Sequence, residues 1–436
     1  MKVVILGAGE SGVGAALLAK QLKYEVFVSD RGSIKEKYKQ ELIENNIPFE
    51  ENKHSEKKIF EASEIIKSPG IPDKVDLIHR LKDAGIPVIS EIEFAGKHTN
   101  ATIVAITGSN GKTTTTNLTY HLLQSAGLDA ALGGNVGYSF ARLLTEELHQ
   151  YYVLELSSFQ LDGIKAFRPD ISMLLNISPD HLDRYEYKME NYVASKFRVM
   201  MNQRAEDHFI FNAKDENILS FLKNEKLKVN LIEVDDVKTT NEKLIVNQFD
   251  FDLSQTSLKG RHNLFNATCA IKAAILLGVE KKAIQLGLNS FVNAPHRLES
   301  VCTTNNVEYI NDSKATNVDA VYFALDAMTK PIVWIVGGTD KGNDYGPILD
   351  LVESKVKAIV CLGLDNTKIL EVFTPIVKNI EETKSANEAV AIASTYAESG
   401  DVVLLSPACA SFDLFKNYED RGDQFKSAVL GLKIKD

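Results

Sequence analysis

The sequence predicts an α/β protein built from three domains. Two glycine-rich loops, at residues 7–12 and 108–113, each follow a short apolar run and precede a helical pattern. Elsewhere apolar runs alternate with amphipathic segments, which is the pattern of parallel sheets covered by helices on both faces. The length of 436 residues agrees with a count of three domains, because domains average about 150 residues.

The first domain is expected over residues 1–92. The runs KVVILG, YEVFVSD, EIIKSPG and IPVIS indicate buried parallel strands, and the segments between them indicate amphipathic helices. This alternation predicts a Rossmann-like N-terminal domain that begins with the first glycine loop.

The central domain is expected over residues 93–295 and the C-terminal domain over residues 296–436. TIVAITG, YYVLELS, DISMLLN and HFIFNA predict a mostly parallel, P-loop ATPase-like sheet around the second glycine loop. LIVNQFDFDLSQTSL alternates apolar and polar residues, which predicts an antiparallel edge. VEYINDS, PIVWIVGG, VKAIVCLG and DVVLLSP predict a C-terminal Rossmann-like α/β domain, with ligands at the ends of its strands.

Charge and composition exclude several classes of function. The net charge is −10, from 49 basic and 59 acidic residues, which argues against binding to nucleic acid or to anionic membranes. No apolar run approaches the roughly 20 residues that span a bilayer, and the N-terminal run is too short for a signal peptide. We therefore expect a cytoplasmic protein without membrane insertion. A monomer is expected as well, although charge and composition do not determine the oligomeric state. Reduced thiols are expected at four widely spaced cysteines: Cys269, Cys302, Cys361 and Cys409.

The first glycine loop matches a dinucleotide fingerprint. Gly7, Gly9 and Gly12 follow a predicted strand, and Asp30 stands about 20 residues on, where an acid binds a ribose in such folds. Read alone, this pattern predicts an NAD-dependent dehydrogenase. A dehydrogenase would leave the second glycine loop unused.

The second loop predicts binding of a nucleoside triphosphate. Gly108 and Gly111 allow backbone N–H groups to converge on a phosphate at the start of the following helix. Lys112 can reach the terminal phosphates, and the Thr113 hydroxyl can bind Mg²⁺. The loop departs from the strict P-loop pattern, because Ile106 stands where the first glycine is expected. A solvated turn is the alternative, but the strand before it and the helix after it favour the phosphate loop.

Polar residues also follow two other predicted strands of the central domain. Glu155 ends YYVLE, and a carboxylate oxygen there suits Mg²⁺. Asp180 and His181 follow the strand DISMLLN and reach the same sheet edge. A capping glutamate and a polar helix start are the ordinary alternatives. Composition and spacing do not separate a kinase from a ligase.

A series of longer motifs narrows the choice. TGSNGKTTTT, ELSSFQL, NISPDHLDRY, GRHNLFNATCAI, PHRLE, NDSKATN and LLSPACASFDLFKNYEDRG stand in the order seen in Mur ligases. Over essentially its whole length the sequence resembles the D-glutamate-adding branch of that family. The resemblance implies an ATP-dependent amide ligase that adds D-glutamate to UDP-N-acetylmuramoyl-L-alanine through an acyl phosphate, in cytoplasmic peptidoglycan precursor synthesis. It also implies that the first loop holds uridine diphosphate, not NAD.

The resemblance further implies the site residues, with ATP and two Mg²⁺ ions as cofactors. The implied catalytic residues are Lys112, Glu155, His181 and Lys196. The implied metal ligands are Thr113, Glu155, His181 and Lys196, the last as a CO₂-derived carbamate. The implied ATP-binding residues are Gly108, Asn110, Gly111, Lys112, Thr113, Thr114, Asn263, Asn266, Arg297, Asp312 and Lys314. The implied UDP-sugar-binding residues are Glu10, Ser11, Asp30, Arg31, Ser68, Gly70 and Asn135. The implied D-glutamate-binding residues are Thr316, Lys341, Ser411 and Tyr418.

Three positions bear on how far the resemblance reaches. Arg31 directly follows Asp30, and Phe412 and Tyr418 stand where aliphatic or phenylalanine residues are expected, so the sequence departs from the family pattern there. Without the resemblance, Lys196 would be read as a solvent-facing helix lysine.

Two other functions are the alternatives to this reading. A folylpolyglutamate-synthase-like ligase should lack the N-terminal block, and a non-catalytic regulator would bind ATP without forming a product.

Overall fold

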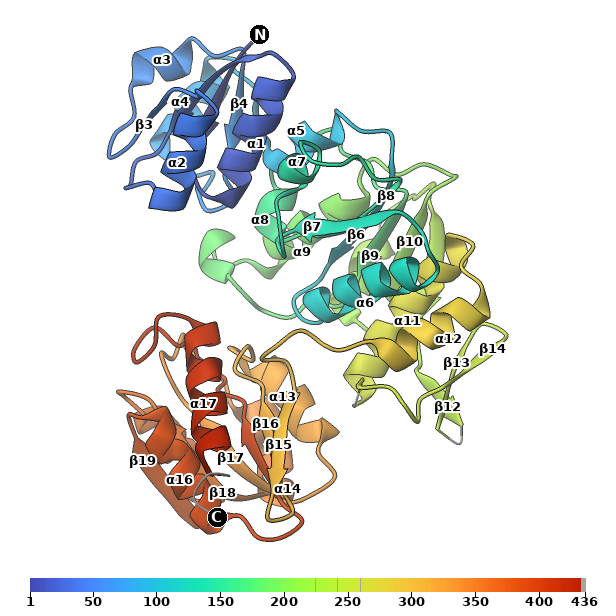
Figure 1. The fold of residues 1–436 in the computed structure, drawn as a ribbon, viewed down its shortest axis with the longest axis vertical. Helices are drawn as coiled ribbons and strands as arrows, with labels where there is room; N and C mark the ends of the chain where they lie inside the picture. The colour runs from blue at the N-terminus through green and yellow to red at the C-terminus, as the bar shows by residue number, and fades with distance from the viewer. Residues whose placement is uncertain (224, 241, 259, 433–436) are drawn as a thin grey trace. The chain divides into compact units, whose positions relative to one another are not determined.

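The computed structural model describes residues 1–223, 225–240, 242–258 and 260–432 (Figure 1). Its contacts divide the chain into two units. Unit 1 comprises Met1–Thr256 and Phe265–Phe291, and unit 2 comprises Ser257–Leu264 and Val292–Asp436. The predicted α/β class, with parallel sheets, is confirmed in both units.

The N-terminal block of unit 1 contains a parallel sheet of strand order β3-β2-β1-β4-β5. Alternate residues of β1 face opposite sides, so Val3 and Ile5 pack under α1 and α2, while Val4 and Leu6 pack under α3 and α4. The strands are β1 (Lys2–Leu6), β2 (Glu25–Ser29), β3 (Phe49–Glu50), β4 (Glu64–Lys67) and β5 (Val88–Ser90). The helices are α1 (Glu10–Gln21), α2 (Glu36–Glu44), α3 (Glu56–Phe60) and α4 (Asp76–Asp83).

The central block of unit 1 contains a second parallel sheet, of order β11-β10-β9-β6-β8-β7. Its strands are β6 (Thr102–Thr107), β7 (Ala130–Gly134), β8 (Tyr151–Glu155), β9 (Ile171–Leu174), β10 (His208–Asn212) and β11 (Asn230–Val234). Its helices are α6 (Lys112–Ser125), α7 (Phe140–Leu143), α8 (Ser158–Leu161), α9 (Met189–Phe197), α10 (Glu216–Leu222), α11 (Arg261–Leu276) and α12 (Lys281–Ser290), with 3₁₀ turns η1 (Leu182–Arg184) and η2 (Arg198–Met200). The first turn of α11 falls in unit 2.

The predicted antiparallel edge forms a separate sheet instead. The strands β12 (Lys238–Thr240), β13 (Lys243–Val246) and β14 (Phe249–Asp252) pair antiparallel with one another. They add no strand to the parallel sheet, whose described edge strand is β11. The side-chain amide of Gln285 attaches this small sheet to α12, because it accepts a hydrogen bond from the Asp252 N–H and donates one to the Asp252 carbonyl.

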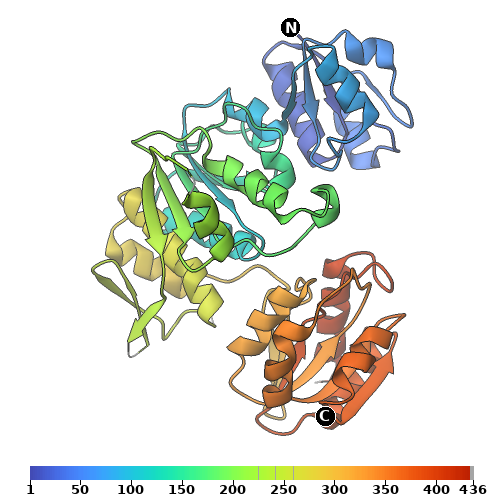
Figure 2. The ribbon, with the colours of Figure 1, turned by 180° about the vertical axis from the view of Figure 1, so that it is seen from behind.

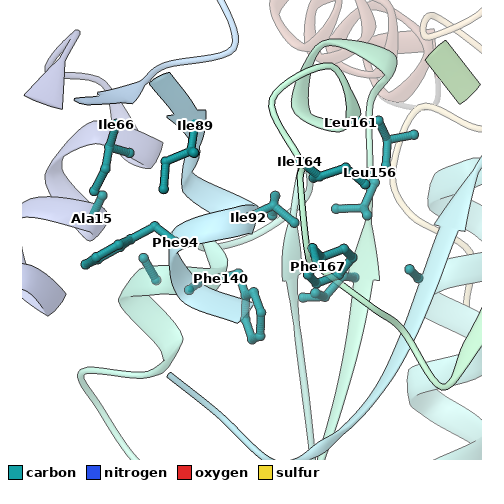
Figure 3. Packing of buried hydrophobic residues seen from close by; sticks show 14 of the residues in the cluster. Ala15, Ile66, Ile89, Ile92, Phe94, Phe140, Leu156, Leu161, Ile164 and Phe167 are labelled. Carbon is teal, nitrogen blue, oxygen red and sulfur yellow. The ribbon is translucent and has the colours of Figure 1, made fainter. Parts of the chain in front are cut away.

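The two blocks of unit 1 share one hydrophobic core through α5 (Glu91–Gly96). Figure 3 shows Phe94 of this helix near Ala15 of the N-terminal block, and Ile92 on the side of Ile164 of the central block; all four belong to one cluster. The Glu93 carboxylate accepts three consecutive backbone N–H groups, those of residues 165–167, at 2.8–2.9 Å. The linker is therefore a buried helix rather than a flexible segment.

Unit 2 contains a sheet of order β15-β16-β20-β17-β18-β19, in which only β15 pairs antiparallel among the described strands. Helices cover both of its faces, α13–α15 on one and α16–α17 on the other (Figure 2). The strands are β15 (Glu299–Thr304), β16 (Val307–Asn311), β17 (Ile332–Val336), β18 (Val356–Leu362), β19 (Asn379–Thr383) and β20 (Val402–Leu405). The helices are α13 (Val318–Ala327), α14 (Leu349–Lys355), α15 (Thr367–Phe373), α16 (Ala386–Tyr396) and α17 (Tyr418–Leu432), with the 3₁₀ turn η3 (Gly346–Ile348). Within the described ranges, no helix combines the length and apolarity that a membrane crossing needs.

Candidate functional site

The second glycine loop joins β6 to α6, as the sequence predicts. Gly111 is the N-cap of α6 and has φ of +83°, a left-handed conformation that favours glycine. A Cβ atom there would also lie 2.6 Å from Asn266 Oδ1, so the position has no room for a side chain. The Lys112 ammonium donates to the carbonyls of Gly108 and Ser109, at 2.8 Å each. The lysine therefore lies folded over its own loop, next to the helix N-terminus that would receive a phosphate.

Residues after β9 hold this loop in shape. Asn176 accepts from the Asn110 N–H at 2.8 Å and donates to the Asn110 carbonyl at 3.0 Å. Ser109 Oγ donates to the Ser178 carbonyl at 2.9 Å and lies 3.1 Å from the Tyr192 hydroxyl. Sequence reasoning did not single out Asn176 or Tyr192: Asn176 opens the motif NISPDHLDRY, but only Asp180 and His181 were chosen there, and Tyr192 stands outside the quoted motifs.

Two buried oxygens at this edge of the sheet make no hydrogen bond among the described residues: Thr107 Oγ1 and Glu155 Oε2. They end the neighbouring strands β6 and β8. Glu155 is 2% exposed, and its other oxygen accepts from the Asn135 amide at 2.8 Å. Buried polar atoms are normally satisfied, so these two oxygens fit a hard cation such as Mg²⁺.

Lys196 comes from α9 and is 1% exposed. Its ammonium nitrogen donates to the Gly108 carbonyl at 2.8 Å and lies 4.7 Å from the centre of the Tyr192 ring. Burial, reinforced by the positive charge of Lys112, lowers the pKa of Lys196 well below its ordinary value. This setting therefore favours the unprotonated amine more than a solvated position would.

Asp180 and His181 follow β9 at the same edge of the sheet. His181 has φ of +52°, and its ring lies 5.2 Å from that of Phe159. Its Nε2 lies 3.5 Å from an Asp180 carboxylate oxygen, and about half of its side chain is exposed. The strand order β9-β6-β8 thus brings His181, the glycine loop and Glu155 to one edge.

The first glycine loop borders a cavity of about 860 Å³ in the N-terminal block. Gly12 allows close packing of α1, since a Cβ atom there would lie 1.9 Å from the Gly7 carbonyl oxygen. The Asp30 carboxylate accepts from the backbone of Ala8 and of Gly32, at 2.7 Å each, and so braces the loop. Six of the predicted UDP-sugar residues line this cavity: Glu10, Ser11, Asp30, Arg31, Ser68 and Gly70.

Two predicted UDP-sugar residues make other contacts as well. Glu10 accepts from Arg142 Nε at 2.7 Å and from the Ser139 N–H at 3.2 Å, both in the central block. Arg142 also forms a two-bond ion pair with Glu41 of α2. Asn135 does not line the cavity and instead holds Glu155, through the amide bond and a backbone bond of 2.8 Å. Sequence reasoning missed Arg142, since nothing local marks an arginine in a short helix.

In unit 2, three neighbouring strands bring the predicted D-glutamate residues to one sheet edge. Thr316 follows β16, Ser411 follows β20 and Lys341 follows β17, in the spatial order β16-β20-β17. Thr339 and Ala410 exchange backbone hydrogen bonds of 2.8 and 3.2 Å, which join two of these loops. Lys341 is exposed, whereas Ser411 is buried.

The remaining predicted residues of unit 2 lie around the end of β16. Asp312 accepts from Ser406 Oγ at 2.9 Å and from the Leu298 N–H at 3.1 Å, and burial raises its pKa to about 7. The Lys314 ammonium lies 4.9 Å from the centre of the Tyr418 ring. Arg297 lies just before β15.

The two asparagines of α11 fall in different units. Asn263 belongs to unit 2 and Asn266 to unit 1. Asn266 lies beside Gly111, since a Cβ atom on that glycine would lie 2.6 Å from Asn266 Oδ1. Their role in binding ATP stays a prediction.

Arg421 of α17 links the loops of unit 2 and was missed by sequence reasoning. Its guanidinium donates to Ser313 Oγ and to the carbonyls of Ser313, Gly337 and Cys409, at 2.8–3.4 Å. These acceptors precede Lys314, Lys341 and Ser411, each on a different loop. Only the fold reveals this function, because the acceptors lie up to 108 residues away in sequence.

The fold and these sites define a class of nucleotide-binding α/β protein with one glycine loop over a cavity and a second over candidate cation ligands. Family models match the chain at residues 2–76 (MurD N-terminal domain), 106–274 (Mur ligase middle domain) and 296–409 (Mur ligase, glutamate ligase domain). The chain belongs to the Mur ligase family, as the sequence predicts.

Curated relatives span the full chain. A protein from Christiangramia forsetii named UDP-N-acetylmuramoylalanine–D-glutamate ligase is 52% identical over 442 residues, which cover 99% of each chain. A protein of the same name from Cytophaga hutchinsonii is 49% identical over 445 residues and 99% of each chain.

Solved Mur ligases share the fold at low sequence identity. UDP-N-acetylmuramate–alanine ligase MurC from Thermotoga maritima has a TM-score of 0.61 at 18% identity, with all of both chains covered. MurF ligase from the same organism, in complex with ADP, has a TM-score of 0.63 at 15% identity, with 93% of this chain and 95% of that chain covered.

Proposed function

We propose that this chain is the ATP-dependent ligase that joins D-glutamate to UDP-N-acetylmuramoylalanine, the step in peptidoglycan precursor synthesis for which its relatives are named. The observation that carries the proposal is the pair of glycine loops in unit 1, one over a cavity of about 860 Å³ and one beside the orphaned oxygens of Thr107 and Glu155. A reaction between a nucleotide sugar and ATP uses both loops, whereas a dehydrogenase uses one.

ATP binds with its phosphates at the N-terminus of α6. The backbone N–H groups that follow Gly111 and the Lys112 ammonium neutralise phosphate charge, which is the main requirement of phosphoryl transfer. Thr113 and Glu155 would hold one Mg²⁺, and His181 with a modified Lys196 would hold a second. Magnesium, when bound, withdraws charge from the phosphate oxygens and from the acceptor carboxylate.

Lys196 carries the modification as a carbamate. Its neutral amine attacks CO₂, an N–C bond forms and one amine proton leaves to solvent, so a cationic side chain becomes a carboxylate. The low pKa of Lys196 supports this step, because only the unprotonated amine reacts. The product would accept hydrogen bonds from Lys112 and could bind a cation that an ammonium would repel.

The chemistry proceeds through an acyl phosphate. An oxygen of the alanyl carboxylate attacks the γ-phosphorus of ATP, and the bond from that phosphorus to the bridging oxygen breaks to release ADP. The amine of D-glutamate then attacks the acyl carbon, loses a proton, and expels inorganic phosphate as the amide bond forms. Phosphorylation turns a poor leaving oxygen into a good one, which is why the ligation consumes ATP.

The two carboxylates of D-glutamate are bound in unit 2 by Lys341, Thr316, Ser411 and the segment at Tyr418. Lysine and hydroxyl donors suit a dianionic amino acid. The uridine diphosphate part of the other substrate occupies the N-terminal cavity, with its diphosphate at the glycine loop before α1. The enzyme works in the cytoplasm as a monomer. Sedimentation of the full chain tests this oligomeric state.

Release of ADP tests the function directly. We expect ADP and phosphate to form only when UDP-N-acetylmuramoyl-L-alanine, D-glutamate, ATP and Mg²⁺ are all present. Release of ADP without the sugar nucleotide would instead favour another ligase or an ATPase. Binding of NAD in the N-terminal cavity with displacement of UDP would contradict the assignment of the first loop.

A further inference from the structure

A hydrogen-bonded cluster borders the N-terminal cavity near the ends of β2 and β3. Ser29 Oγ lies 2.8 Å from Glu50 Oε1 and 2.7 Å from His54 Nδ1. Glu50 also accepts from the Ser55 N–H at 2.6 Å and from the Ser55 hydroxyl at 2.5 Å. Ser29 and Glu50 are buried, and His54 lines the cavity.

The cluster fixes which ring nitrogen of His54 carries the proton. Bonds from Ser55 and Ser29 outweigh burial and lower the pKa of Glu50, so this carboxylate only accepts. Ser29 has a single hydroxyl hydrogen, and the carboxylate at 2.8 Å takes it in preference to the Lys53 carbonyl at 3.5 Å. Ser29 Oγ must then accept from His54, so the ring proton is on Nδ1.

His54 therefore offers a lone pair on Nε2. Burial lowers the pKa of the imidazole, against the opposing effects of Glu50 and Asp30, so the ring is neutral at neutral pH. Nε2 makes none of the hydrogen bonds found among the described residues, and the ring borders the cavity. The cavity thus contains a fixed acceptor, set by residues behind it.

The acceptor lies on the side of the cavity where a nucleobase would be. The diphosphate belongs at the glycine loop before α1, and the ribose belongs near Asp30, at the end of β2. His54 follows β3, the next strand outward in the order β3-β2-β1. A nucleotide that extends along this edge brings its base to His54.

We propose that His54 Nε2 accepts a hydrogen bond from the ring N3–H of uracil and so selects uridine over cytidine nucleotides. Uracil has a donor at N3, whereas cytosine has an acceptor there, and two facing acceptors repel. The chain Glu50–Ser29–His54 keeps the ring in the tautomer that makes this choice. Ser29 and Glu50 are positioning residues, and the inference rests on the proposed binding of uridine diphosphate.

Calorimetric titration of the full chain with UDP and with CDP tests the inference, since the ligands differ only in the base. We expect the wild type to bind UDP at least about 10-fold more tightly than CDP. His54→Asn keeps a donor for Ser29 but lacks Nε2. It should weaken UDP binding about 10-fold, change CDP binding less than about twofold, and so remove the preference.

A matched control and an independent readout complete the test. His79→Asn alters an exposed histidine of α4 and should leave both affinities unchanged. Ser29→Ala removes the hydrogen bond that fixes the His54 tautomer, so it should also reduce the preference for UDP over CDP. Nitrogen-15 NMR of histidine-labelled wild type should report a proton on Nδ1 of His54.

The outcomes separate the two proposals. An unchanged ratio of UDP to CDP affinity in His54→Asn, or a proton on Nε2 in the free protein, would overturn the assignment to His54 alone. A wild type that binds neither nucleotide would overturn the proposed function of the N-terminal cavity. If His54→Asn fails to fold, Ser29→Ala and the NMR measurement still decide the question.

Discussion

Lys112 and Lys196 donate hydrogen bonds to the same backbone oxygen, that of Gly108, each at 2.8 Å. Two ammonium groups on one carbonyl repel each other, and Lys196 is the more deeply buried. The pair therefore favours loss of a proton from Lys196, which the proposed reaction with CO₂ requires.

Replacement of Lys196 should abolish ligation. Lys196→Ala removes the site of the carbamate, and we expect turnover to fall at least about 100-fold. Acetate or formate should restore part of the activity, since either acid can fill the space and supply a carboxylate. Lys188→Ala changes an exposed lysine next to the same helix and should have no effect. Wild-type turnover by Lys196→Ala without added acid would refute the role of the carbamate.

Glu91 should make stability depend on pH. Burial raises the pKa of Glu91 to about 8 from its ordinary value of 4.5, and Oε2 has no partner among the described side chains. Between these values the folded state binds more protons than the unfolded state. The free energy of unfolding therefore falls as pH rises from about 4.5 to about 8, by at most about 1.4 kcal/mol per pH unit.

Urea unfolding at several pH values measures this effect. Glu91→Gln cannot ionise but can still accept from the Ala141 N–H, as Glu91 Oε1 does. The variant should be less sensitive to pH over that range and more stable than the wild type at pH 8. An equal slope in both proteins would show that Glu91 does not titrate there.

Arg142 should stabilise the junction of the two blocks of unit 1. It is paired with Glu10 and Glu41, and the three side chains are 10%, 28% and 26% exposed. Arg142→Met leaves two carboxylates unpaired and should lower the free energy of unfolding by about 1–3 kcal/mol, less than for a fully buried pair. Arg80→Met breaks an exposed pair with Glu56 and should have a smaller effect than Arg142→Met, because solvent screens that pair.

A double-mutant cycle identifies the cause. If the loss comes from the stranded charge, Glu10→Gln should be less harmful in the Arg142→Met background than in the wild type. Additive effects of Glu10→Gln and Arg142→Met in urea unfolding would rule out direct coupling.

Arg421 should control the affinity for the amino-acid substrate. Burial lowers its pKa to about 10, so it stays charged at neutral pH while it joins three loops. Arg421→Lys keeps a charge but cannot make all four bonds, and we expect KM for D-glutamate to rise at least about fivefold. KM for UDP-N-acetylmuramoyl-L-alanine should change less than twofold, since the proposed site for that substrate lies in unit 1. The exposed neighbour Lys416→Met is the control, and an unchanged KM for D-glutamate would contradict the prediction.

Much of the fold could be predicted because its strands are buried on both faces. KVVILG, TIVAITG and PIVWIVGG are continuous apolar runs, and each forms a central strand of a parallel sheet. The edge strands β3, β7, β11, β15 and β19 were not predicted. The strand β3 is two residues long and β19 is largely exposed, so no apolar run marks either strand.

The site was predictable where a residue ends a strand or stands in the loop after it. Glu155 ends β8, and Gly111 and His181 lie in the loops after β6 and β9; these strands are neighbours, so one sheet edge gathers the three residues. Their chemical roles stay predictions. Sequence reasoning did not choose Arg421, although it stands in the motif LLSPACASFDLFKNYEDRG, or His54, because the partners that give them their roles are distant in sequence.

By itself the sequence determined the family, the α/β class and the two glycine loops, because these depend on local periodicity and on short runs of residues. Only the tertiary structure decided the burial of Lys196, the pairing of Arg142 and the proton position on His54. Charge states and hydrogen-bond direction depend on burial and on neighbours from distant segments, and these exist only once the chain has folded.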